Sequence, residues 1–201
     1  MPNTPFWDCP ATREHLTGIL LRGDRAAALD MLKNGQRQAL SACRDALMRD
    51  LTARHLAREA PFCQLTAVAQ AASVLHDPAL PPVACCGALR GNTSAASHNF
   101  MLMLLRAWGM PTLDLGVDVA AERFLEAVER QHLPFAVCAA FSEADAACVR
   151  EIHDLALRRG LRGWFRLAVC GARLELGGLP VDCPEYKTAA VAGWMVRAWK
   201  G

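Results

Sequence analysis

The pattern of apolar residues along the chain changes at Val83, and this change most constrains how the chain can fold. Residues 12–76 carry apolar residues at helical spacing only, whereas from residue 83 onward short apolar runs alternate with amphipathic stretches. Strands that alternate with helices indicate right-handed crossovers and a parallel sheet. The three prolines of HDPALPP (76–82) mark a linker between the two parts. We therefore expect a helical domain over 1–77 and an α/β domain over 83–201.

The helical part is expected to contain four helices, with Asp24 as the cap of the second. In the α/β part, strands are expected near 83–88, 112–115, 134–140 and 165–170, with a possible fifth near 179–182. Helices are expected near 95–108, 120–131, 143–160 and 186–199. Asp118 is the expected cap of the second of these helices, and Ser142 with Glu143 that of the third. Ligands on parallel sheets bind beyond the carboxyl ends of the strands, which points to the loops 88–94, 116–119, 140–145 and 170–178.

Composition excludes several classes of function. The chain has 201 residues, is 53% hydrophobic and 21% charged, and carries a formal net charge of +2, so it offers no broad basic field for nucleic acid. No apolar run reaches the roughly 20 residues of a membrane span. The N-terminal segment lacks the basic region and apolar core of a signal peptide. We expect a cytoplasmic protein that binds neither nucleic acid nor membrane.

The nine cysteines are an odd number without a CxxC pair, which indicates neither a disulfide framework nor a zinc knuckle. Cys85 and Cys86 are neighbours in a strand and face opposite sides of the sheet. Cys138 and Cys170 end neighbouring strands, so a thiolate site at the cleft is an alternative. The simpler interpretation is that the cysteines are small buried hydrophobic residues.

Three stretches of the sequence resemble one known family. They are LLRGDRAAALDML in the helical part, GNTSAASHNF at 91–100, and WGMPTLDLGVDVAAERFLEAVERQHLPFAVCAA further on. Together they resemble the cobalamin-binding corrinoid proteins of methyltransferase systems, over residues 14–199. The resemblance implies a four-helix cap followed by a flavodoxin-like, Rossmann-like cobalamin domain with a parallel sheet. It also implies cobalamin as cofactor and a methyltransferase or a corrinoid-activating protein as partner, and it allows a homodimer.

The family's motif for the lower cobalt ligand is altered in this chain. The family carries G-D-x-H-x-x-G-x-N, and matching it to residues 91–99 places Asn92 at the aspartate, Ser94 at the histidine and Ser97 at the glycine. A hydroxyl is a poor ligand for cobalt, and an amide cannot supply the carboxylate that orients a ligating histidine. The resemblance therefore implies a corrinoid protein without the usual lower histidine.

The family's site for the nucleotide tail of cobalamin also differs here. Where the family has an S-x-L motif, this chain has Ala140 and Ser142. Where the family has a Gly-Gly pair, this chain has Cys170 and Gly171. A side chain at position 170 would narrow the tail channel, because protein interiors have little spare volume. The residues at candidate cofactor-binding positions are thus Asn92, Ser94, Ser97, Ala140, Ser142, Cys170, Gly171 and Asp118.

Two histidines are candidate metal ligands. His55 lies near the position of the aromatic residue that, in the family, ends the cap helix over the upper face of the corrin. Imidazole is a competent ligand for cobalt or for haem iron. His98 lies four residues past Ser94 and is the other candidate.

The resemblance implies a carrier of methyl groups or a cofactor sensor, in which the cofactor supplies the chemistry. Such a chain is a cofactor-binding protein rather than a stand-alone enzyme. Two alternatives stay open. A haem-binding sensor would suit the altered tail site, because haem has no tail, and a cofactor-free interaction module would keep the fold as a scaffold.

Overall fold

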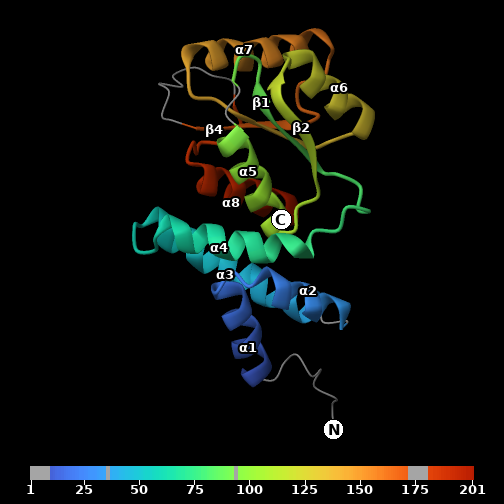
Figure 1. The fold of residues 1–201 in the computed structure, drawn as a ribbon. Coiled ribbons are helices and arrows are strands. Elements are labelled where there is room, and N and C mark those ends of the chain that lie inside the picture. The colour runs from blue at the N-terminus through green and yellow to red at the C-terminus, as the bar shows by residue number, and fades with distance from the viewer. Residues whose placement is uncertain (1–9, 35–36, 93–94, 172–180) are drawn as a thin grey trace. The chain divides into compact units, whose positions relative to one another are not determined.

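The computed structural model describes residues 10–34, 37–92, 95–171 and 181–201 (Figure 1). The chain divides into two compact units. The helical unit runs to Asp77 and includes Arg106–Gly109, while the α/β unit comprises Pro78–Leu105 and Met110–Gly201. The short segment Arg106–Gly109 was not expected in the helical unit.

The helical unit has the four helices that the periodicity predicts. They are α1 (Pro10–Leu21), α2 (Arg25–Lys33), α3 (Arg37–Leu56) and α4 (Phe62–Ala72), followed by a 3-10 turn, Ser73–Leu75. The expected cap of α2 is confirmed, because the Asp24 side chain accepts a hydrogen bond from the backbone N of Ala27 at 2.9 Å. The core of this unit consists of fully buried apolar side chains, among them Leu16, Leu20, Leu40, Met48, Leu51 and Leu65.

The α/β unit is built on a sheet with four parallel strands in the described residues. The strands are β1 (Ala84–Leu89), β2 (Thr112–Val119), β3 (Phe135–Ala139) and β4 (Arg166–Cys170), in the order β2-β1-β3-β4. The helices are α5 (Ala95–Ala107), α6 (Ala121–Gln131), α7 (Glu143–Arg158) and α8 (Thr188–Lys200). This order is that of flavodoxin-like sheets and confirms the predicted fold class. Of the possible fifth strand at 179–182, Val181 and Asp182 are not in a strand, and the first two residues lie outside the described part.

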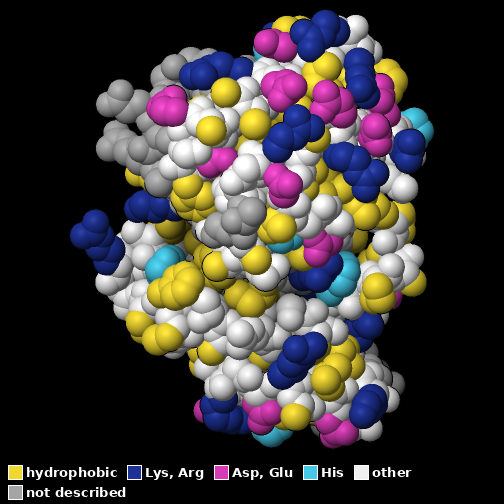
Figure 2. Space-filling model, turned by 45° about the horizontal axis from the view of Figure 1, so that its top comes forward, with side chains coloured by type: hydrophobic (Ala, Val, Ile, Leu, Met, Phe, Trp, Pro, Cys, Tyr) yellow, Lys and Arg dark blue, Asp and Glu magenta, His cyan; other side chains and the backbone are white. Residues whose placement is uncertain are grey.

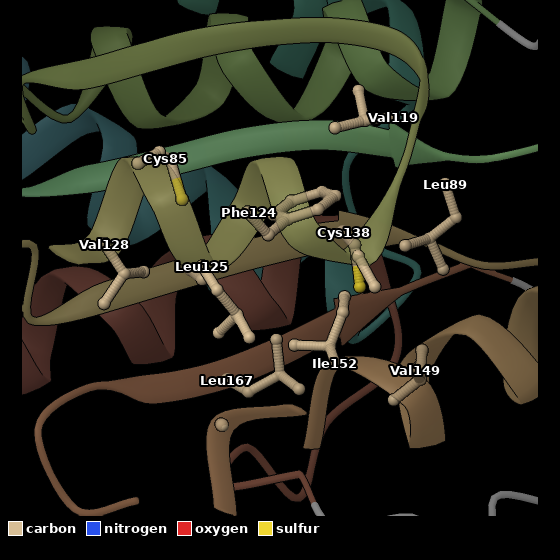
Figure 3. Close-up of a cluster of buried hydrophobic side chains, with 14 of the residues drawn as sticks. Cys85, Leu89, Val119, Phe124, Leu125, Val128, Cys138, Val149, Ile152 and Leu167 are labelled. Atoms are coloured by element: carbon tan, nitrogen blue, oxygen red, sulfur yellow. The ribbon is translucent and has the colours of Figure 1, made fainter. Parts of the chain in front are cut away.

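Helices cover both faces of the sheet (Figure 1). On one face, Cys85, Cys138 and Leu167 join a buried cluster with side chains from α6 and α7 (Figure 3). Those helical side chains are Phe124, Leu125, Val128, Val149 and Ile152. Helices α5 and α8 lie on the opposite face. A Cβ at Gly87 would lie 2.9 Å from Cζ of Phe124, so glycine at this position of β1 lets the ring pack against the strand.

The structure corrects two expectations about the strand ends. Cys138 pairs in register with Val169, the neighbour of Cys170, so the two cysteines face opposite sides of the sheet and cannot share a ligand. Strand β2 extends to Val119, so residues 116–119 end a strand rather than form a free loop. The N-cap of α6 is Ala120, with no side-chain cap, because the Asp118 carboxylate is engaged elsewhere.

The surface carries charges of both signs. Figure 2 shows basic and acidic side chains interspersed over the outer face of α6 and α7. Among them, Arg123 lies 3.8 Å from Glu126, and Arg159 lies 3.0 Å from Glu129. Within the part of the chain that the structure describes, no helix is long and apolar enough to cross a membrane.

Candidate functional site

A pocket of about 490 Å³ lies at the carboxyl ends of the strands of the α/β unit. The loop between β1 and α5 and the loop between β3 and α7 form its walls. Its lining consists of Arg90, Gly91, Asn92, Ser97, Phe141, Ser142, Ala144 and Asp145. Of the residues that the sequence marks as cofactor-binding, the structure brings Asn92, Ser97 and Ser142 together here. Ser94 lies outside the described residues.

The β1–α5 loop is held in place by Asp118 at the end of β2. Its Oδ1 accepts a hydrogen bond from the backbone N of Gly91 at 2.7 Å, and its own N lies 3.4 Å from the carbonyl oxygen of Asn92. Gly91 has a φ of +82°, which favours glycine. The side-chain amide of Asn92 donates to the carbonyl oxygen of Ala139 at 3.5 Å. Asp118 therefore shapes this wall of the pocket, although it does not line it.

The β3–α7 loop is held by Asp145, which is buried. Its Oδ2 accepts hydrogen bonds from the backbone N of Phe141 at 2.7 Å, from the backbone N of Ser142 at 2.9 Å and from the Ser142 hydroxyl at 2.9 Å. Ser142 is the N-cap of α7, as predicted, but its partner in the capping box is Asp145 and not Glu143. The Ser142 hydroxyl is thus already engaged within its own loop.

The three other positions expected at a nucleotide tail, Ala140, Cys170 and Gly171, do not line the pocket. The side chains of Ala140 and Cys170 are fully buried. A Cβ at Gly171 would collide with the carbonyl oxygen of Ala140, which shows how closely the ends of β3 and β4 approach. Burial raises the pKa of Cys170 to about 12, against a weaker opposing effect of a hydrogen bond with Thr188. Cys170 is therefore a neutral thiol near neutral pH.

His98 points into the α/β unit, and its side chain is 3% exposed. Its Nε2 lies 2.8 Å from Oδ1 of Asp114 in β2, and its Nδ1 lies 3.7 Å from Sγ of Cys86. Burial raises the pKa of Cys86 well above its usual value, so the thiol is neutral and its S–H can donate to Nδ1. Both ring nitrogens are then engaged. The sequence interpretation missed this pair, although a polar Asp114 within an apolar strand was a signal for a buried partner.

His55 lies in the last turn of α3 and is half-buried. Its Nδ1 is 3.3 Å from the carbonyl oxygen of Ala60, and its ring lies 6.0 Å from that of Phe62 at an interplanar angle of 51°. A proton on Nδ1 would be donated to Ala60 and would leave the Nε2 lone pair without a partner among the described residues. A hydrogen bond from the second ring nitrogen to a carbonyl is the usual setting of a metal-ligating histidine.

The described residues contain no group of three or more His, Cys, Asp and Glu side chains that could hold a metal ion. This finding covers residues 10–34, 37–92, 95–171 and 181–201. The finding concerns metal sites in which protein side chains supply all the ligands. A metal that is already held inside a tetrapyrrole would not require such a group.

Helices on both faces of a parallel sheet, together with a separate helical unit, define a class of α/β fold in which ligands commonly bind beyond the carboxyl ends of the strands. No protein-family model matches the sequence, and no curated protein matches it. Solved structures do match the fold. A cobalamin-binding protein from Desulfitobacterium hafniense matches with a TM-score of 0.73 and 18% identity, over 94% of this chain and 98% of that one.

Two further matches come from Methanosarcina barkeri. A chain of its methanol:cobalamin methyltransferase complex matches with a TM-score of 0.67 and 17% identity, over 92% of this chain and 78% of that chain. Its monomethylamine corrinoid protein matches with a TM-score of 0.54 and 16% identity, over 92% and 96% of the two chains. These matches confirm that the chain has the fold of the corrinoid proteins that the sequence resembles.

Proposed function

We propose that this chain binds a corrinoid, cobalamin, and serves a methyltransferase system as a methyl carrier or cofactor sensor. The observation that carries the proposal is the shared fold, which covers 94% of this chain and 98% of a cobalamin-binding protein. A match of that extent includes the helical unit as well as the sheet. We also propose the boundaries 1–77 and 83–201 for the two domains. The proposed partner is a methyltransferase or a corrinoid-activating protein, and a homodimer is part of the same proposal.

The residues of the α/β unit fit a corrinoid whose cobalt would not be bound by the lower histidine that the family uses. His98 is engaged with Asp114 and Cys86, and the Asn92 amide lies 3.5 Å from the carbonyl oxygen of Ala139. The pocket beyond the strands would contact the cofactor through Asn92, Ser97 and Ser142. We keep Ser94, Ala140, Asp118, Cys170 and Gly171 as predicted positions around it. When bound, cobalamin supplies a cobalt centre that can carry a methyl group.

We propose that His55 would supply the protein nitrogen that binds the metal of the cofactor. The hydrogen bond of Nδ1 to the Ala60 carbonyl fixes the imidazole so that Nε2 is the free nitrogen. The ring of Phe62 lies beside the imidazole, with 6.0 Å between the ring centroids. A nitrogen that is already oriented in this way loses little conformational entropy when it binds a metal.

The test is reconstitution of the full chain with hydroxocobalamin, followed by gel filtration and a visible spectrum. We expect stoichiometric colour to elute with the protein, and we expect His55→Ala to shift the cobalt bands toward those of the free cofactor. His15→Ala is the matched control, because His15 is an exposed histidine of the same unit. Protein that elutes colourless would contradict the corrinoid proposal. Bound cofactor with an unchanged spectrum in His55→Ala would remove His55 alone.

A second function has one observation in its favour. Two buried side chains lie near the positions where the family places its lower ligand and its tail, since His98, four residues past Ser94, is 3% exposed and Cys170 is 0% exposed. A cofactor-free interaction module on the same scaffold would have such a filled interior. It predicts colourless protein that still binds a methyltransferase or another corrinoid protein. A haem titration of the same samples tests the haem-sensor alternative, which predicts a Soret band that His55→Ala abolishes.

A further inference from the structure

A second cavity lies at the opposite end of the sheet, where β4 begins. Its volume is about 420 Å³, which is within the range of small-molecule sites. The lining comes from α7, from the turn that follows it, from the start of β4 and from the segment after residue 180. It consists of His153, Ala156, Arg162, Gly163, Phe165, Arg166, Leu167, Val181 and Asp182. We propose that this cavity binds a small organic anion through a carboxylate or phosphate group.

Arg162 is held in position on one wall. Its Nη1 lies 3.2 Å from Nε2 of His153, and a guanidinium can only donate, so this imidazole nitrogen accepts. The proton of the imidazole is then on Nδ1, which lies 3.4 Å from Oδ1 of Asp154. The chain Asp154–His153–Arg162 therefore orients the guanidinium before any ligand binds. Such ordering reduces the entropy that binding would otherwise cost.

Arg166 supplies the second positive charge of the cavity. Its backbone N donates to the carbonyl oxygen of Pro134 at 2.9 Å, which anchors the residue at the first position of β4. Neither the Arg162 nor the Arg166 guanidinium has a carboxylate partner among the described residues. Guanidinium groups bind carboxylates and phosphates with paired, charge-assisted hydrogen bonds. Two guanidinium groups on one cavity, neither with a carboxylate partner in the described part of the chain, favour an anion.

Asp182 also lines the cavity, but its carboxylate is hydrogen-bonded to the backbone of β4. Its Oδ2 accepts a hydrogen bond from the backbone N of Leu167 at 2.7 Å, and its own N donates to the carbonyl oxygen of Leu167 at 2.9 Å. These two bonds tie the segment after residue 180 to β4 and close that wall. Among the described lining residues, two arginines and one aspartate leave a net positive charge. A bound anion would lie toward the arginines.

The rest of the lining is apolar and can accommodate a short carbon skeleton. Ala156, Leu167 and Val181 belong to this part, together with Phe165. Trp164 lies between Gly163 and Phe165 of the lining, and its side chain is 63% exposed. Trp164 lines a neighbouring pocket that shares Gly163, Phe165 and Arg166 with the cavity, so its indole can report on binding nearby. Size, charge and apolar lining together indicate a small organic acid or phosphate ester.

The experiment titrates the ¹⁵N-labelled full chain with sodium phosphate and, separately, with sodium succinate at constant ionic strength. The indole N–H resonance of Trp164, identified by its loss in Trp164→Phe, is followed by NMR. We expect a saturable shift with at least one probe, and binding about tenfold weaker in Arg162→Gln and in Arg166→Gln, since each removes a charge-assisted contact. Arg123→Gln is the matched control, because Arg123 is an exposed arginine on α6, away from the cavity.

Each outcome decides the proposal. A response to phosphate alone identifies a phosphate ligand, a response to succinate alone identifies a carboxylate, and a response to both shows recognition of either anion. No saturable shift with either probe would overturn the proposal. Equal weakening in the arginine variants and in Arg123→Gln would also overturn it, since the effect would then be one of net charge. The corrinoid reconstitution uses neither probe, so the two proposals can fail separately.

Discussion

The buried imidazole of His98 in α5 and the partly exposed carboxylate of Asp114 in β2 form a hydrogen-bonded pair, with Nε2 and Oδ1 2.8 Å apart. The same oxygen accepts a hydrogen bond from the backbone N of Gly116 at 2.9 Å. The pair therefore joins the first turns of α5 to the irregular part of β2. It lies next to the loop where the resembling family presents a cobalt ligand, and here the imidazole stabilises the fold.

Removal of this imidazole should destabilise the α/β unit. His98→Ala removes the partner of the buried Cys86 thiol and one of the partners of the Asp114 carboxylate, and it creates a cavity, so it should lower the free energy of unfolding by about 3 kcal/mol. Asp114→Asn keeps an acceptor oxygen and should cost about 1 kcal/mol. Urea denaturation measures both. Glu126→Gln, on the exposed face of α6, is the control. Equal stability of His98→Ala and the parent would show that the pair contributes nothing.

Loss of the Asp145 carboxylate should weaken the loop that begins α7. Asp145→Ala leaves the backbone N–H groups of Phe141 and Ser142 without their acceptor, at a cost of about 3 kcal/mol in the free energy of unfolding. Glu143→Ala changes an exposed acidic residue of the same turn and should cost less than about 0.5 kcal/mol. Chemical denaturation of the two variants separates these values. Similar losses in both would mean that Asp145 acts only through its charge at the helix start.

A side chain at Gly171 should separate the ends of β3 and β4. In Gly171→Ala the new Cβ would collide with the Ala140 carbonyl, and φ is +151°, so we expect a loss of about 3 kcal/mol. Gly116→Ala is a matched control, since Gly116 has a φ of +83° but open space around its Cβ position. Its cost should be about 1 kcal/mol, from backbone conformation alone. Thermal melts of the two variants test the difference, and equal melting temperatures would refute the close approach.

The buried thiol of Cys170 should make the fold sensitive to alkaline pH. Its pKa is raised from 9.0 to about 12, so between these values the folded state keeps a proton that the unfolded state has lost. Stability that is fully present below pH 9 is therefore lost as the pH rises toward 12. Urea denaturation at increasing pH measures how the free energy of unfolding falls as the pH rises. We expect this fall to be less steep in Cys170→Ala than in the parent, by about 1 kcal/mol per pH unit.

The control for this pH series is Cys63→Ala. Cys63 is exposed, so its replacement should leave the slope of the parent unchanged. If Cys170→Ala follows the parent at every pH, then the Cys170 thiol ionises alike in the folded and unfolded chains, and its burial has no part in alkaline unfolding.

The order of the elements could be predicted from the sequence because periodicity and caps act over a few residues. Apolar runs located β1, β3 and β4 to within two residues at each end, and the side chains of Asp24 and Ser142 marked the starts of α2 and α7. The quoted stretches also indicated the corrinoid-protein fold, which the solved structures confirm.

Contacts between distant segments were decided by the tertiary structure. The Asp118 carboxylate binds Gly91 across the sheet instead of capping the nearby helix, and His98 pairs with Asp114 of another element. Cys138 and Cys170 both lie near strand ends, but the register of β3 and β4 places them on opposite faces. A one-residue change of register would reverse that result, and register depends on how whole strands pack against their helices. The sequence by itself determined which elements form and in what order, and packing determined which side chains meet.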